Sequence, residues 1–181
     1  MPDRRTAQEA LQRLTVDVAD WPEKGVTFKD ITPVLADHNA FSAIITALAA
    51  VGRDGHGNVV VDKVVGMEAR GFILAAPVAL ALGVGFVPVR KAGKLPREAH
   101  AVSYALEYGE ATLEVHTDAI TPGERVLMVD DVLATGGTAV ATRQLIEACG
   151  GVATGASVLM ELSFLGPRGV TGDLPVESLL T

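Results

Sequence analysis

The chain has 181 residues, of which 49% are apolar, and a formal net charge of -7 with an isoelectric point near 5.0. This length suits one domain with a substantial buried core. The acidic balance argues against general affinity for nucleic acid or for an anionic membrane surface, so neither partner is expected. Cys149 is the only cysteine, which excludes an internal disulfide, and the four histidines lack the spacing of metal ligands.

The N-terminal region combines a helix with irregular sequence. The start of the chain lacks the apolar core of a secretion signal, so we expect a cytoplasmic protein. Thr6-Ala-Gln-Glu9 has the form of a capping box and predicts that a helix begins there. Helical periodicity then breaks, and residues 26–33 predict an irregular segment that contains Phe28. Because aromatic side chains commonly fill cores, we expect Phe28 in the core, with stacking on a flat ligand as the alternative.

A helix and a strand lead to a polar turn that ends in an arginine. Apolar residues at helical spacing predict a helix over residues 39–51, and the apolar run over residues 59–65 predicts the first strand of a sheet. Residues 66–71 then form a strand-to-helix turn. Arg70 lies at the end of this turn, where it is either a solvated arginine or a group that attracts an anion to the helix start.

An uncharged run of residues follows, from Phe72 to Val89. It is long enough to span a membrane. Gly83, Gly85 and Pro88 interrupt the run, so we expect a buried helix, a turn and a buried strand instead. Strands covered by helices on both faces need such apolar sequence, which favours a parallel sheet.

Positive charge gathers directly after this strand, although the chain as a whole is acidic. Arg90, Lys91, Lys94 and Arg97 lie within eight positions, together with a glycine and a proline. A solvated loop is the default interpretation of such a charge run. A mobile lid over a polyanion is the alternative, because lysine and arginine can neutralise charge on a leaving group. Alternating apolar and polar residues over 102–116 then predict a β-hairpin.

Residues 125–138 are the most informative stretch, because a strand passes there into an anion-binding loop. Val126 to Val129 form an apolar run that predicts a buried strand ending at Asp130 and Asp131. Ligands of open α/β sheets bind outside the carboxyl ends of strands. The small residues 134–138 let backbone N–H groups approach an anion, and Thr138 is expected to begin the next helix, whose dipole attracts negative charge.

The loop matches neither a Walker A motif nor a dinucleotide fingerprint, since no lysine follows Gly137. Turning the chain needs neither of the two adjacent acids, whereas the two cis-hydroxyls of a ribose would use both. A helix ending near Cys149 and a last sheet strand within residues 152–162 complete the alternation of strands and helices. No chemical motif is recognisable after Gly166.

The sequence Asp-Asp-Val-Leu-Ala-Thr-Gly-Gly-Thr over residues 130–138 resembles the phosphoribosyl pyrophosphate (PRPP) motif of the type I phosphoribosyltransferases. Further stretches resemble the adenine phosphoribosyltransferase family in the same order along the chain, namely residues 25–30, 68–72, 90–96 and 104–109. The resemblance covers roughly residues 20–165. It implies an α/β fold with a doubly wound, mostly parallel sheet and a small flap or hood.

The resemblance also implies how the chain is organised and what it does. Residues 1–181 would form a single phosphoribosyltransferase domain, with the first helix and base-binding segment in residues 1–35 and a flexible loop and hairpin flap in residues 90–120. The implied reaction belongs to purine salvage and joins PRPP to N9 of adenine, giving AMP and pyrophosphate. The implied cofactor is Mg²⁺, bound mainly through PRPP with no protein metal ligands, and the implied assembly is a homodimer.

Roles for individual residues follow from the same resemblance. Glu107 is the implied catalytic base at adenine N7, and Phe28 is implied to stack on adenine, which reverses the expectation from its residue type. The peptide bond between Glu68 and Ala69 is implied to be cis. Lys29 stands where relatives often carry arginine, and lysine would weaken a bidentate contact. The full set of implied substrate-binding residues is Asp130, Asp131, Ala134, Thr135, Gly136, Gly137, Thr138, Arg70, Glu68, Ala69, Phe28, Thr27, Lys29, Arg90, Lys91 and Lys94.

Two other functions stay open on the sequence. A PRPP- or purine-sensing regulator could use the same fold, because fold does not fix function. Such a regulator would typically carry a DNA-binding module or lack the flap glutamate, and this chain has no basic recognition helix and retains Glu107. The other alternative is a phosphoribosyltransferase for guanine or hypoxanthine.

Overall fold

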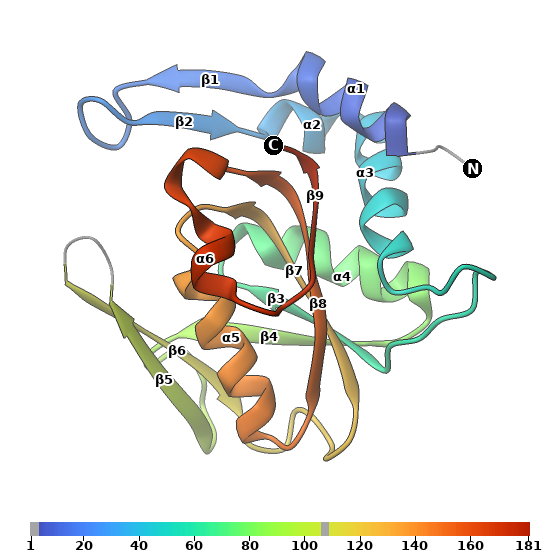
Figure 1. The fold of residues 1–181 in the computed structure, drawn as a ribbon, viewed down its shortest axis with the longest axis vertical. Helices are drawn as coiled ribbons and strands as arrows, with labels where there is room; N and C mark the ends of the chain where they lie inside the picture. The colour runs from blue at the N-terminus through green and yellow to red at the C-terminus, as the bar shows by residue number, and fades with distance from the viewer. Residues whose placement is uncertain (1–3, 106–108) are drawn as a thin grey trace.

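A twisted sheet runs through the centre of the molecule, in a computed structural model that describes residues 4–105 and 109–181 (Figure 1). Its strand order is β5-β6-β4-β3-β7-β8-β9. The strands β4, β3, β7, β8 and β9 run parallel to one another, whereas β6 pairs antiparallel with both β4 and β5. The bounds are β3 (Lys63–Met67), β4 (Gly85–Lys91), β5 (Ala99–Ala105), β6 (Glu110–His116), β7 (Arg125–Leu133), β8 (Val152–Glu161) and β9 (Val176–Leu180).

Helices cover both faces of this sheet, which confirms the predicted doubly wound, mostly parallel α/β fold. On one face pack α1 (Arg4–Leu14), α3 (His38–Ala50) and α4 (Arg70–Leu82), and on the other packs α5 (Gly137–Ala148). Each face of the sheet packs against its helices in a separate hydrophobic core, and alternate residues of β7 point into the two cores. Leu127 belongs to the core under α1, α3 and α4, and Met128 to the core under α5. Each such fully buried side chain stabilises the fold by roughly 1.5–3 kcal/mol.

The uncharged run over residues 72–89 forms most of α4, a turn and most of β4, as predicted. Gly83 ends the helix in a left-handed conformation with φ of 71°, which glycine adopts without steric cost. Within residues 4–105 and 109–181, none of the helices combines the length and apolar character that crossing a membrane requires.

Several predictions for the first part of the chain are wrong. The first helix begins at Arg4, so Thr6 lies inside it and the capping box does not mark its start. The irregular segment contains β2 (Thr27–Asp30), which pairs with β1 (Val16–Ala19) in a separate antiparallel hairpin, and is followed by α2 (Thr32–Ala36). The first strand of the main sheet covers Lys63–Met67, because Val59 instead bridges back to Arg53 across the polar loop.

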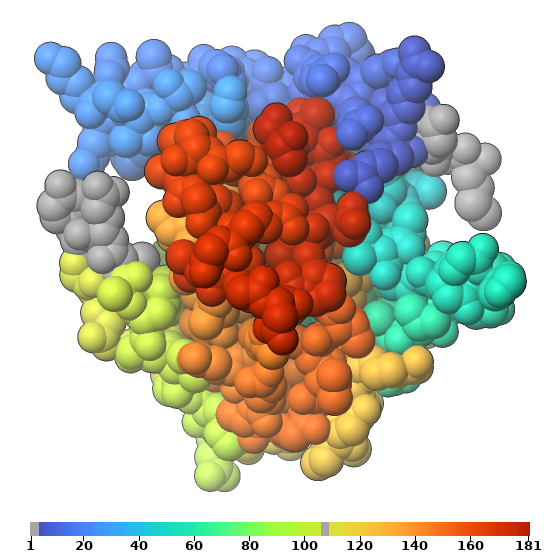
Figure 2. Space-filling model, in the orientation of Figure 1, coloured from blue at the N-terminus to red at the C-terminus, as the bar shows by residue number. Residues whose placement is uncertain are grey.

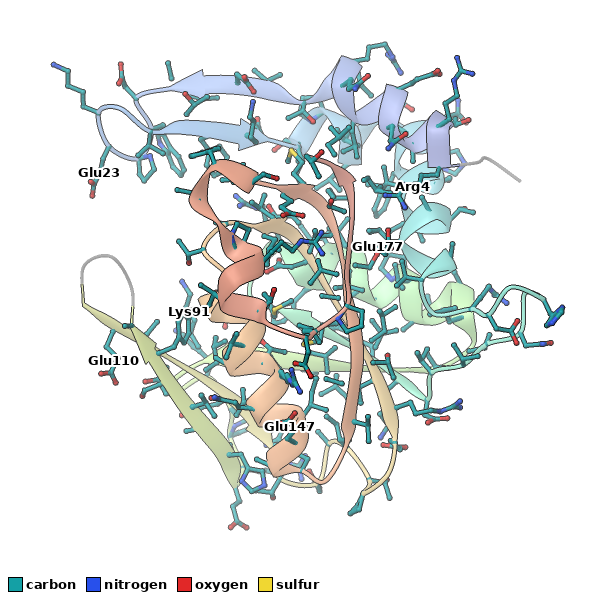
Figure 3. All side chains as sticks on the ribbon, in the orientation of Figure 1. Arg4, Glu23, Lys91, Glu110, Glu147 and Glu177 are labelled. Atoms are coloured by element: carbon teal, nitrogen blue, oxygen red, sulfur yellow. The ribbon has the colours of Figure 1, made fainter. Side chains whose placement is uncertain are left out.

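The C-terminal region is also more structured than predicted. A short 3-10 helix (Ser163–Leu165) and α6 (Pro167–Thr171) follow β8. β9 then pairs with β8 and forms the edge of the sheet, so the strand predicted within residues 152–162 is not the last one. The N-terminal residues (blue) lie against the C-terminal ones (red) in Figure 2. Arg4 pairs with Glu177 at 2.9 Å, as Figure 3 allows the reader to follow, and thereby ties α1 to β9.

Candidate active site

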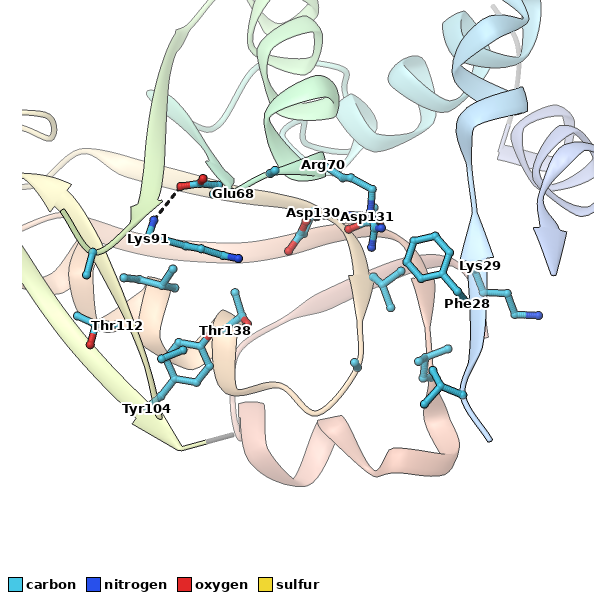
Figure 4. Close-up of a pocket in the computed structure, with 18 of the residues that line it drawn as sticks. Phe28, Lys29, Glu68, Arg70, Lys91, Tyr104, Thr112, Asp130, Asp131 and Thr138 are labelled. Atoms are coloured by element: carbon cyan, nitrogen blue, oxygen red, sulfur yellow. Dashed lines mark hydrogen bonds and ion pairs between the residues drawn. The ribbon is translucent and has the colours of Figure 1, made fainter. Parts of the chain in front are cut away.

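A cleft of about 840 Å³ opens at the carboxyl ends of the central strands (Figure 4). Its walls come from six parts of the chain: β2, the turn between β3 and α4, the end of β4, the β5–β6 hairpin, β7 with the loop and helix start after it, and the residue that follows β8. The position agrees with the general rule for ligands of open α/β sheets. Residues far apart in the sequence therefore share one cavity.

The two adjacent acids lie within β7 and not after its end, which corrects the prediction. β7 continues to Leu133 because β8 still pairs with it there, whereas the pairing with β3 stops at Val129. One edge of β7 is thus open beside Asp130 and Asp131, and both acids line the cleft. Asp130 accepts a hydrogen bond from the backbone N–H of Asp131 at 2.9 Å. Burial, and then the charge of Asp131, raise the pKa of Asp130 well above its ordinary value.

Arg70 connects the acid pair with the aromatic side of the cleft. Its Nε donates to Asp131, whose side chain is 7% exposed, while the arginine side chain is 40% exposed. The guanidinium also lies 4.8 Å from the centre of the Phe28 ring, which is a cation–π distance. Arg70 begins α4, so the turn predicted to carry it places it beside the cleft and not in open solvent.

Phe28 is half-buried and lines the cleft, and it belongs to neither hydrophobic core. The expectation from its residue type, that Phe28 fills the core, is therefore wrong. Trp21 packs edge-on against its ring with 4.6 Å between the centroids. Trp21 and the Arg70 guanidinium, which lies over the ring, are thus the neighbours that hold the Phe28 side chain, while the hairpin strand β2 supplies its backbone.

Lys29 and Thr27 flank Phe28 on β2 and both line the cleft. The Lys29 ammonium group lies 2.7 Å from both carboxylate oxygens of Asp17 on β1. Figure 4 shows this side chain directed away from Phe28 and the acid pair. The charge of Lys29 is thus paired within the hairpin.

The turn between β3 and α4 holds the basic end of the cleft in place. The Glu68–Ala69 peptide bond is cis, as the family resemblance implied. Glu68 accepts hydrogen bonds from the backbone N–H of Lys91 at 2.9 Å and from Arg90 Nε at 3.0 Å. The hydrogen bond from the Lys91 backbone has the largest effect and the bond from Arg90 a smaller one, and together they hold the pKa of Glu68 below its usual value although burial raises it.

The predicted basic loop begins later than expected, because Arg90 and Lys91 still belong to β4. Lys91 lines the cleft, and its side chain points into it in Figure 4. Lys94 is exposed in the loop between β4 and β5 and is not among the cleft-lining residues. Arg97 pairs with Asp118 at 2.6 Å instead.

The glycine loop encloses a smaller cavity of about 70 Å³ next to the main cleft, lined by Ala134, Thr135, Gly136 and Thr138 among others. α5 begins at Gly137 and not at Thr138, and its N-cap residue, Gly136, has no side chain with which to cap the helix. Gly136 has a φ of 89°, and a Cβ added there would meet the Pro167 carbonyl oxygen at 3.0 Å. Glycine is therefore required by both conformation and space.

The predicted catalytic base, Glu107, lies outside the described residues. The cleft also contains residues that sequence reasoning did not assign, in particular Val26, Tyr104, Thr112 and Leu162. Leu162 follows β8, and nothing in its apolar surroundings distinguishes it from a core leucine. Tyr104 falls in a stretch used for the family resemblance, but only the antiparallel hairpin brings its hydroxyl to Thr138, at 3.0 Å.

The fold and the cleft define a phosphoribosyltransferase. The strands β3 to β8, the acid pair on β7 and the glycine loop before α5 lie within the region that matches the Phosphoribosyl transferase domain family, residues 32–162. An adenine phosphoribosyltransferase from Nocardioides sp. is 64% identical over 180 residues, covering 99% of this chain and 97% of that protein. The chain belongs to the adenine phosphoribosyltransferase family, and it is accordingly a transferase of purine salvage.

Solved structures agree with this assignment. The adenine phosphoribosyltransferase of Thermoanaerobacter pseudethanolicus superposes with a TM-score of 0.89 at 46% identity, covering 96% of this chain and 98% of that one. The Saccharomyces cerevisiae enzyme, in complex with D-2,5-dideoxy-2,5-imino-altritol 1,6-bisphosphate and adenine, gives a TM-score of 0.92 at 38% identity. In that comparison 97% of this chain and 99% of the yeast chain are covered.

Proposed function

We propose that this cleft transfers the 5-phosphoribosyl group of PRPP to N9 of adenine, with release of AMP and pyrophosphate. One observation carries the proposal: an aromatic platform, a pair of carboxylates and a glycine loop share one cleft. Phe28, the acids Asp130 and Asp131, and Ala134 and Thr138 all line it. A flat base, a ribose with two hydroxyls and a phosphate need these three kinds of surface.

The sugar and its phosphate would bind along β7 and the loop after it. Asp130 and Asp131 accept hydrogen bonds from the ribose hydroxyls, and the backbone N–H groups of residues 134–138 hold the 5′-phosphate. The start of α5 adds the positive end of its dipole, which favours an anion there. Binding of the ribose to Asp131 competes with Arg70 for the same carboxylate.

Adenine would lie against Phe28, with Leu162 as a second apolar wall of the same cleft. Glu107 is the proposed general base at N7, which makes the ring more nucleophilic at N9. Replacing Glu107 with glutamine tests this role. We expect kcat/KM for adenine to fall well beyond threefold, and a value within about threefold of wild type would refute proton transfer by Glu107.

Pyrophosphate would leave toward the basic side of the cleft. Lys91 lines this side, and Glu68 anchors Arg90 and the Lys91 backbone, while Arg70 adds positive charge from between the acid pair and Phe28. Lys94 is carried on the adjoining loop, from which it would approach the leaving group. Bond cleavage to pyrophosphate runs ahead of attack, so positive charge develops on the ribose, and the protein contributes positioning and electrostatic stabilisation.

The carboxylate pair also fits a magnesium ion carried by the substrate. The described residues contain no cluster of three or more acidic, histidine or cysteine ligands that could hold a metal ion. Mg²⁺ usually binds one or two carboxylates together with substrate phosphates and water, and Asp130 and Asp131 are carboxylates of the cleft that would face the proposed ribose. When bound, the ion would neutralise charge on the pyrophosphate oxygens.

We also propose that the chain works as one phosphoribosyltransferase domain in a cytoplasmic homodimer. Large apolar side chains on α4 and the strand after it support an interface, since Leu80 is 82%, Ile73 45% and Phe86 36% exposed. Sedimentation velocity tests this part of the proposal. A dimer that dissociates when Leu80 becomes aspartate would support it, and a monomer at micromolar concentration would refute it.

The reaction itself is tested by incubating the protein with PRPP, Mg²⁺ and one base at a time, and by following pyrophosphate release. We expect turnover with adenine and much less with guanine or hypoxanthine. Preference for another purine would reassign the substrate. No turnover with any base, despite binding of PRPP, would favour a sensor on the same fold.

A further inference from the structure

The β5–β6 hairpin reaches the glycine loop through a single tyrosine. Tyr104 lies near the end of β5, and its hydroxyl oxygen is 3.0 Å from Oγ1 of Thr138 in the first turn of α5. Its ring packs against Gly137, where an added Cβ would lie 2.9 Å from Cδ2 of the tyrosine. Figure 4 shows Tyr104 and Thr138 pointing toward one another at the edge of the cleft.

We propose that Tyr104 is a positioning residue for the 5′-phosphate, acting through the hydroxyl of Thr138. The inference rests on the proposed function, in which residues 134–138 bind that phosphate. Tyr104 contributes from outside the loop. In the sheet order three strands separate β5 from β7, the strand that leads into the loop, and more than thirty residues of sequence separate Tyr104 from Thr138. The phosphate site is thus completed by the hairpin and not by the loop alone.

The chemistry of the two hydroxyl groups sets the direction of their hydrogen bond. Each hydroxyl carries one proton, and either oxygen could be the donor at this distance. A phosphate dianion accepts hydrogen bonds and donates none, so Thr138 must direct its proton to the phosphate. Tyr104 then donates to Thr138, and this donation fixes the threonine hydroxyl and makes it a stronger donor.

The packing of the ring supports the same role. Because Gly137 has no Cβ, the tyrosine ring can lie directly against the start of α5 and hold its hydroxyl beside Thr138.

The hairpin offers a matched control in the neighbouring residue. Ser103 and Thr112 form another hydroxyl pair, with 2.7 Å between their oxygens, across the same two strands. Ser103 is exposed and does not line the cleft.

The experiment compares Tyr104→Phe with Ser103→Ala in the full-length protein, each shown by circular dichroism and thermal melting to be folded. Dissociation constants are measured for AMP and for adenosine, which differ only in the phosphate. We expect Tyr104→Phe to weaken AMP binding and to raise KM for PRPP by about three- to tenfold, the size of one hydrogen bond. Adenosine binding, KM for adenine and kcat stay within about twofold, and Ser103→Ala resembles wild type.

A double-mutant cycle with Thr138→Val separates action through Thr138 from other effects. We expect Tyr104→Phe to have no further effect on AMP binding in the Thr138→Val background. Additive effects, an equal loss of AMP and adenosine binding, or wild-type affinity of Tyr104→Phe for AMP would each overturn the inference. If wild-type protein neither turns over adenine with PRPP nor prefers AMP to adenosine, the proposed function has failed instead.

Discussion

Replacing Phe28 with leucine distinguishes a residue that binds the base from one that fills the core. The ring lines the cleft, and its protein neighbours are the edge of Trp21, at 4.6 Å between centroids, and the Arg70 guanidinium at 4.8 Å. Leucine keeps apolar contact but loses the flat face on which adenine would stack. The substitution should therefore act on adenine binding far more than on PRPP binding.

The size of the effect follows from these contacts. Stacking of a base on an aromatic side chain contributes roughly 1–3 kcal/mol, of which leucine retains a part. A remaining loss of about 1–2 kcal/mol corresponds to a rise of about 5- to 30-fold in KM for adenine. The lost contacts with Trp21 and Arg70 should lower the free energy of unfolding by only about 1–2 kcal/mol, because both partners are partly exposed.

The assay is steady-state pyrophosphate release with adenine and PRPP varied in turn, together with urea unfolding of the same samples. Val18→Ala is the matched control, since Val18 pairs with Phe28 across the hairpin but does not line the cleft. Truncation of an aromatic side chain in a core costs ~3–5 kcal/mol. A loss of unfolding free energy of about 3 kcal/mol or more, with KM unchanged for both substrates, would refute the assignment of Phe28 to the base.

Three further predictions concern the sheet and its acids. Gly71→Ala should raise KM for PRPP at least about tenfold and lower Tm. The new Cβ would lie 2.9 Å from Asp130 Oδ1 and 3.0 Å from the Val129 carbonyl oxygen, so the acid would have to move. Wild-type kinetics of this variant would contradict the prediction. AMP should bind more tightly as pH rises through the raised pKa of Asp130, because the ionised carboxylate accepts hydrogen bonds from the ribose hydroxyls more strongly than the protonated acid. Calorimetry should show that Asp130→Asn lacks this pH-dependent part of the binding free energy. Hydrogen bonds from Arg125 lower the pKa of Asp62 to about 2. The contribution of this pair to the free energy of unfolding is therefore fully present above pH ~4 and is lost as the pH falls through about 2. An acid-unfolding curve of Asp62→Asn that matches wild type would refute this contribution.

Strong local patterns made much of the fold predictable from sequence. The uncharged run over residues 72–89 leaves few choices other than a buried helix and strand, and Gly83 ends the helix where expected. The acids Asp130 and Asp131, beside an apolar strand and a glycine loop, located the cleft correctly because that order of residue types is chemically specific. Their position inside β7 depends on how far β8 continues to pair, which no local pattern reveals.

Elements stabilised by distant partners were the ones missed. The strands β1 and β2 have four residues each, and β1 is exposed throughout while β2 is half-buried after its first residue, so neither shows alternating burial along the strand. β9 contains only five residues and is fixed by pairing with β8. Phe28 was misassigned because its residue type fits a core as well as a ligand site. The partnership of Tyr104 with Thr138 arises only when the hairpin folds across α5.

The most direct test of the account is a crystal structure of this protein soaked with AMP. We predict that the 5′-phosphate accepts hydrogen bonds from the backbone N–H groups of residues 134–138, that the ribose hydroxyls face Asp130 and Asp131, and that adenine lies on Phe28. A nucleotide bound elsewhere, with the glycine loop left without phosphate, would contradict the central claim.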